Sequence, residues 1–198
     1  MRKLMLAGAA IALLAGCGGP TAGTGGDEAK KDIVIGVIAD LTGATADVGK
    51  PTNEGLLAYV DNLNAKGGVQ GHKIKLLNED YQYKVPVAEE KYKKFVAEGA
   101  VAIQGWGTGD SEALRGKVKD DQLPFMSASY AEVLTDPKQS PYNFVVAPTY
   151  SDQLRVALDH IAAQDPTAQV AMLHHDSPFG TAPLADGEKW IKDKGYKL

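Results

Sequence analysis

The sequence predicts an α/β fold, a doubly wound parallel sheet with helices on both faces. From residue 33 onward, short apolar runs alternate with longer stretches whose apolar side chains recur at helical spacing. Within this pattern, residues 101–111 read as a buried strand, an open glycine-rich loop and the start of a helix. Loops of this kind at a switch point of an open sheet bind ligands, and a helix N-terminus favours an anion. We therefore expect this loop to hold the charged head of a small molecule.

The chain begins with an expected export signal over residues 1–17. A basic head precedes an apolar run, 4–14, that is too short to span a bilayer, which needs about 20 residues. The run ends in Leu-Ala-Gly-Cys, which resembles the bacterial lipobox and implies that Cys17 carries a lipid anchor. The alternative is an ordinary secretory signal with a chance cysteine. Cys17 is the sole cysteine of the sequence, so no disulfide is expected.

Residues 18–31 are rich in Gly, Thr, Pro and Ala and are expected to form a disordered tether. Loss of the leader would change the formal net charge from −4 to −6 by removing Arg2 and Lys3. This mildly acidic surface without a basic cluster argues against a nucleic-acid partner.

The expected elements follow in order. Residues 33–39 are a β-rich apolar run, and 51–66 carry leucines and Val60 on one helical face before a Gly-Gly stop. Residues 73–78 alternate, as in a strand nearer a sheet edge, and 85–99 place apolar residues on one face and lysines opposite. The remaining expected elements are strand 101–104, helix 111–121, strand 123–127, a helical turn at 131–134, strand 142–147, helix 151–163, strand 169–174 and helix 183–194.

Five segments carry a resemblance to a known family. They are Ile35-Gly36-Val37 with Asp40-Leu41-Thr42-Gly43, the stretch Asn62–Ile74 with its Gly-Gly-Val-Gln-Gly centre, Asn78-Glu79-Asp80, Leu123–Ser129, and His175–Gly180. Together they resemble the type I periplasmic solute-binding proteins of ABC importers, in the branched-chain amino-acid-binding family, over residues 32–198. The resemblance implies two α/β lobes in a chain of about twice this length. Residues 32–148 would then be the first lobe and 149–198 the start of a second, in an N-terminal fragment.

The family's ligand contacts in its first lobe map onto the loops 106–111 and 127–131. The resemblance thus implies the ligand-binding residues Trp106, Thr108, Gly109, Ser111, Ser127, Ser129 and Tyr130, with Phe179 from the second lobe. Gly109 and Ala131 stand where the family has a carboxylate-binding serine and an ammonium-binding threonine, which leaves the ligand class open. The three aromatic residues are expected to form walls, with packing as the alternative. Asp110 is expected to cap a helix rather than bind ligand.

Other chemistries find little support in the sequence. The spacing Gly105-x-Gly107-x-Gly109 differs from the dinucleotide-binding pattern G-x-G-x-x-G. His174 and His175 are adjacent near an expected strand end, so their side chains would point to opposite faces. We expect no metal, no cofactor and no catalytic residue.

The sequence thus favours a non-enzymatic, monomeric solute-binding lipoprotein at the periplasm or cell surface. It would deliver a neutral or branched-chain amino acid to an ABC permease. The alternatives are import of an amide or an aromatic carboxylate, a sensory ligand-binding lipoprotein, and a secreted α/β hydrolase with Ser127 as its nucleophile.

Overall fold

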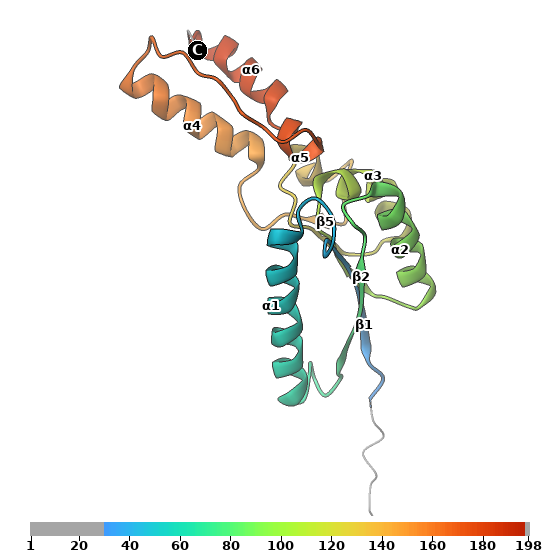
Figure 1. Cartoon of the computed structure of the whole chain (residues 1–198). Coiled ribbons are helices and arrows are strands. Elements are labelled where there is room, and N and C mark those ends of the chain that lie inside the picture. Colours follow the sequence, from blue (N-terminus) through green and yellow to red (C-terminus); the bar gives the residue numbers. More distant parts are fainter. Residues whose placement is uncertain (1–29, 197–198) are drawn as a thin grey trace, which may run out of the picture.

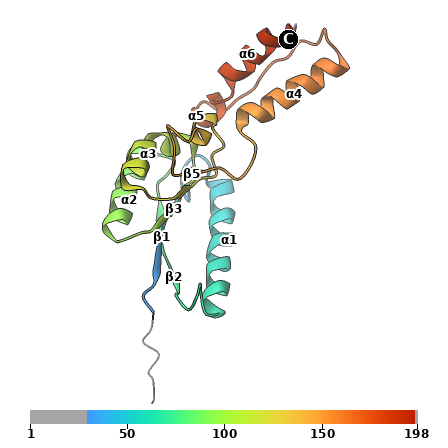
Figure 2. The same ribbon diagram turned by 180° about the vertical axis from the view of Figure 1, so that it is seen from behind.

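The structure, a computed structural model, describes residues 30–196. The expected leader, Cys17 and most of the expected tether lie outside these residues. Within them, a parallel sheet lies between helix α1 on one face and helices α2 and α3 on the other, and helices α4 and α6 form a separate layer beyond one end of the sheet (Figure 1). The view from behind shows the same layers (Figure 2). The predicted doubly wound α/β fold is confirmed.

The sheet has five parallel strands in the order β2-β1-β3-β4-β5. The strands are β1 (Ile33–Ala39), β2 (Ile74–Asp80), β3 (Ala102–Gln104), β4 (Phe125–Met126) and β5 (Asn143–Phe144). The chain winds outward in both directions from β1 and β3, so the switch point lies between them. Strands β4 and β5 are shorter than predicted. One reason at β4 is Pro124, which has no N–H to donate to the ladder.

The helices follow the predicted order, but three of them start earlier than predicted and the short helix at 178–181 was not predicted. They are α1 (Ala46–Ala65), α2 (Val85–Ala97), α3 (Thr108–Asp121), the 3₁₀ turn η1 (Glu132–Thr135), α4 (Tyr150–Gln164), α5 (Pro178–Thr181) and α6 (Leu184–Lys194). Helix α1 continues through Pro51 instead of starting there. Its first turn packs on the end of β1, where a Cβ on Gly49 would lie 2.0 Å from the Asp40 carbonyl oxygen, so only glycine fits.

The predicted strand 169–174 is wrong. These residues form an irregular connection between α4 and α5, and Leu173 is fully exposed. A strand exists only where a neighbouring strand accepts and donates its backbone hydrogen bonds, and no strand of residues 30–196 pairs with this segment. The apolar composition that suggested a strand is therefore left at the surface.

The hydrophobic core lies between the sheet and helices α2 and α3. Its largest fully buried side chains include Tyr81, Tyr92, Phe95, Ile103 and Phe125. The core fixes β1 and β3 side by side and holds the loops at their carboxyl ends in place. No helix in residues 30–196 combines the length and the apolarity needed to cross a membrane.

Candidate functional site

A cavity of about 340 Å³ opens at the carboxyl ends of β1 and β3, between the sheet layer and the α4–α5 region. Its walls come from the β1–α1, β2–α2, β3–α3 and β4–η1 loops and from the starts of α4 and α5. The lining residues are Thr45, Val48, Tyr83, Trp106, Gly107, Thr108, Ala128, Tyr130, Tyr150, Gln153 and Phe179. The cavity thus occupies the switch point at which open α/β sheets bind ligands.

Two carboxylates at the ends of β1 and β2 hold the β1–α1 loop. Asp40 is fully buried and accepts the Gly43 N–H (2.7 Å) and both the N–H and the hydroxyl of Thr45 (2.7 Å each). Asp80 accepts the Leu41 N–H at 2.9 Å. With its hydrogen bonds satisfied inside the protein, Asp40 orients this loop against the cavity.

Aromatic side chains form the apolar walls. Trp106 comes from the β3–α3 loop, and its indole N–H donates to the Thr45 hydroxyl at 2.8 Å. Tyr150 lies with its ring centre 5.7 Å from that of Tyr130 and 5.3 Å from that of Phe179, the latter edge to face. Aromatic pairs at these distances stabilise each other and bring large contact area with few rotatable bonds. The cavity is therefore suited to an apolar group.

Buried hydroxyls join the start of α3, just after the β3–α3 loop, to the β4–η1 loop in two pairs. The Ser111 hydroxyl donates to the Gly107 carbonyl at 2.5 Å and lies 2.6 Å from the Ser127 oxygen. The Thr108 and Ser129 oxygens are 2.7 Å apart. Ser111 has one hydroxyl proton and gives it to Gly107, so Ser127 must donate to Ser111. The pairs fix the separation of the two loops.

The same proton count orients Thr108. Ser129 is 1% exposed and does not line the cavity, so a free hydroxyl proton there would be buried without a partner, at a cost of about 1–3 kcal/mol. The favourable direction is Ser129 donating to Thr108. Thr108 is equally buried (1% exposed) but lines the cavity, so its hydroxyl proton can turn toward the cavity beside the N-terminus of α3, where an anion is favoured.

Asp110 occupies the third position of α3 and caps the helix from there. Its carboxylate accepts the Gly107 N–H at 3.1 Å and the buried Tyr81 hydroxyl at 3.0 Å. Burial raises the pKa of Asp110 to about 7, against the lowering effect of these hydrogen bonds. Burial and the nearby Asp110 charge also raise the pKa of Tyr81. Asp110 caps the helix, but it is not the N-cap that was predicted: Gly107 holds that position, and the helix starts three residues earlier than predicted.

The structure brings four of the predicted ligand contacts to the cavity: Trp106, Thr108, Tyr130 and Phe179. Three others, Ser111, Ser127 and Ser129, lie behind it in the hydroxyl pairs. The remaining one, Gly109, lines a neighbouring cavity of about 340 Å³ next to Asp110, His175 and Pro178. These eight assignments stay predictions.

Tyr83, Tyr150 and Gln153 line the cavity and were not expected from the sequence. A usable signal existed for Tyr150 and Gln153, because both stand just after the expected lobe boundary at residue 148. Tyr83 follows β2 in a left-handed backbone conformation, with φ of 55°, and no sequence signal marked that turn.

Ser127, the nucleophile required by the hydrolase alternative, contacts Ser111 and Ser129 rather than a histidine. Among residues 30–196 no group of three or more His, Cys, Asp and Glu side chains is placed to hold a metal ion. The arrangement suits reversible binding of a small molecule with one anionic and one apolar end.

Comparison with known proteins gives a family match over residues 32–198, to the family described as periplasmic binding protein. The chain is 26% identical to the Leu/Ile/Val-binding protein homolog 7 of Brucella melitensis, over 100% of this chain and 50% of that protein. It thus spans about half the length of the curated relatives it matches.

Two solved structures are similar to the present one. A branched-chain amino acid ABC transporter protein from Thermus thermophilus, with bound valine, matches with a TM-score of 0.80 at 26% identity, over 85% of this chain and 44% of that one. An ABC transporter substrate-binding protein of Aeropyrum pernix matches with a TM-score of 0.75 at 32% identity, over 84% and 44% of the two chains.

Proposed function

The chain belongs to the periplasmic binding protein family, and from this premise we propose that it captures a neutral or branched-chain amino acid for an ABC importer. The family is one of extracytoplasmic solute-binding proteins rather than enzymes. In this proposal, residues 32–148 form the first lobe of the protein and residues 149–198 the start of the second lobe. A lipid on Cys17 would anchor the protein, as a monomer, to the membrane that carries the permease.

The cavity at the switch point supports this proposal. Thr108 offers a hydroxyl proton beside the N-terminus of α3, which suits a carboxylate. Trp106 on one loop and the Tyr130–Tyr150–Phe179 group on the others offer apolar contact for a side chain. The valine bound by the similar Thermus thermophilus protein has both of these ends.

In the proposed mechanism, the two lobes close over the solute. Tyr130 belongs to the first lobe and Tyr150 and Phe179 to the second, so a solute between them contacts both. Contacts made only when the lobes approach favour the closed state over the open one. Gly109 faces the start of α5, where a Cβ on it would lie 3.4 Å from Cγ of Pro178 and 3.3 Å from Cγ2 of Val85.

One observation favours a second candidate, an amide or an aromatic carboxylate. The residues that line the cavity include neither Asp nor Glu, so an ammonium group would have to rely on hydroxyls and backbone carbonyls. A solute without an ammonium group would avoid that demand.

Calorimetric titration of the gene's full-length product separates the two candidates. The solutes are leucine, isoleucine and valine, the acid 4-methylpentanoate, which lacks the amine, leucinamide, which lacks the carboxylate, and the aromatic acid phenylacetate. We expect the three amino acids to bind and leucinamide to fail. If all three amino acids fail, the branched-chain assignment is wrong, and binding of 4-methylpentanoate or of an aromatic acid alone would support the second candidate.

A further inference from the structure

We propose that Trp106 limits the length of the solute's apolar chain, because its indole separates the ligand cavity from a second apolar cavity behind it. In this proposal Thr45 and Asp40 are positioning residues that hold the indole in place. The inference rests on the proposed function and names a specificity determinant within that site.

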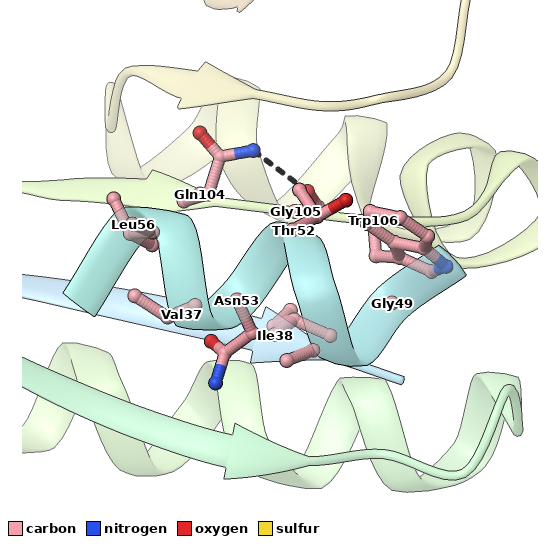
Figure 3. A pocket seen from close by; sticks show the side chains of 10 residues that line it. Val37, Ile38, Gly49, Thr52, Asn53, Leu56, Gln104, Gly105 and Trp106 are labelled. Atoms are coloured by element: carbon pink, nitrogen blue, oxygen red, sulfur yellow. Dashed lines mark hydrogen bonds between the residues drawn. The ribbon is translucent and has the colours of Figure 1, made fainter. Parts of the chain in front are cut away.

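The second cavity, of about 210 Å³, lies between α1 and the face of the sheet formed by β1 and β3 (Figure 3). Val37, Ile38 and Leu56 give it apolar walls, and Trp106 stands at one end, beside Gly49 (Figure 3). Thr52, Asn53 and Gln104 add polar groups, among them the Asn53 side-chain oxygen, which is buried without a hydrogen-bond partner in the described residues. The apolar walls make this space chemically fit for the end of an alkyl chain.

The two cavities meet at Trp106, which lines both. Two pairs of nearby residues, one consecutive and one on either side of Trp106, also divide between them. On α1, Val48 faces the ligand cavity and Gly49 the second one; on the β3–α3 loop, Gly107 faces the ligand cavity and Gly105 the second one. Rotation of the indole would join the second cavity to the first.

Hydrogen bonds oppose that rotation. The Trp106 indole N–H donates to the Thr45 hydroxyl at 2.8 Å, and this hydroxyl uses its single proton to donate to Asp40 at 2.7 Å. Asp40 is itself fixed, because it is fully buried and accepts two backbone N–H groups of the same loop. Turning the indole would leave both its N–H and a lone pair of Thr45 without these partners. The hydrogen bonds from Trp106 through Thr45 to Asp40, called the relay below, therefore hold the indole between the two cavities.

Three variants test the relay. Thr45→Val removes the acceptor at constant shape, and Thr45→Ser keeps it. Thr52→Val is a matched control, because Thr52 lies on the same helix and lines the second cavity, while its hydroxyl donates only within the helix, to the Val48 carbonyl at 2.8 Å.

The first readout needs no solute. In a Trp190→Phe background Trp106 is the only tryptophan of these 198 residues, and acrylamide quenching of its fluorescence reports how freely the indole moves. We expect the quenching constant to rise in Thr45→Val and to stay unchanged in Thr45→Ser and Thr52→Val. An unchanged constant in Thr45→Val would overturn the relay.

The second readout is the affinity of the gene's full-length product for unbranched 2-amino acids with side chains of three to six carbons. We expect Thr45→Val and Trp106→Ala to shift the preference toward the longest chain by about tenfold relative to the unmodified protein. If the affinity falls by the same factor at every chain length, the proposal that Trp106 limits chain length is wrong. If the unmodified protein binds no amino acid, the proposed function fails, and the quenching comparison still decides whether the relay holds Trp106.

Discussion

Replacing Thr108 by valine tests the orientation of the buried hydroxyls, because it affects stability and binding through different atoms. Valine keeps the shape of threonine and removes the oxygen to which Ser129 donates at 2.7 Å. The hydroxyl proton of Ser129, a residue that is 1% exposed, is then left without an acceptor, which should cost about 1–3 kcal/mol in the free energy of unfolding. That is a large share of the roughly 5–15 kcal/mol that holds a domain folded.

The same substitution removes the hydroxyl proton proposed to meet the solute's carboxylate. A hydrogen bond to a charged group contributes about 1.5–3 kcal/mol, so the dissociation constant for an amino acid should rise about 10- to 150-fold. Calorimetric titration measures this, and chemical denaturation of the unliganded protein measures the stability.

The double variant Thr108→Val/Ser129→Ala provides the control, because it removes both partners. Loss of a pair is nearly neutral when neither group is left unsatisfied, so the double variant should regain stability while its affinity stays low. Retention of full affinity in Thr108→Val would refute the role of this hydroxyl in binding. A double variant no more stable than Thr108→Val would refute the inferred proton direction.

Three further outcomes are expected. The pKa of Asp110 is raised from 3.8 to about 7, so its contribution to stability is present below about pH 4 and is lost as the pH rises through 7. The melting temperature of Asp110→Asn should therefore fall less steeply between pH 4 and 8 than that of the unmodified protein, and parallel pH profiles would contradict this. A Cβ on Gly36 would lie 2.4 Å from Phe95 Cδ2 and 2.7 Å from Ile103 Cδ1, so Gly36→Ala should cost about 1–3 kcal/mol in urea denaturation, and an unchanged midpoint would show that the core repacks freely. Trp106→Ala should raise the dissociation constant for valine by about tenfold or more, as expected for a central aromatic contact, and titration showing less than a twofold change would remove Trp106 from the site.

Much of the fold could be predicted from the sequence because the signals are local. The apolar run 33–39 and the helical periodicity of 85–99 each depend on a few consecutive side chains, and both elements form as expected. The order of strands and helices also follows from local patterns. The glycine-rich loop could be placed at the carboxyl end of a strand for the same reason, which located the cavity near Trp106.

The start of α3 and the capping position of Asp110 were harder to predict. Asp110 accepts the hydroxyl of Tyr81, which directly follows β2 and lies 29 residues earlier in the chain, so no local pattern records this contact. The segment 169–174 was predicted wrongly for a related reason. It has the composition of a strand, but a strand also needs a neighbouring strand to pair with.

The sequence by itself determined the alternation of elements, the family and the loop that faces the ligand cavity. Only the tertiary structure decided what each polar side chain of that loop does. Thr108 and Ser129 are 21 residues apart, and Trp106 and Thr45 are 61 residues apart. Their hydrogen bonds exist because β1, β3 and β4 end side by side. Spacing along the chain carries no record of that proximity, which is why the predicted site residues divide between a cavity wall and the buried layer that supports it.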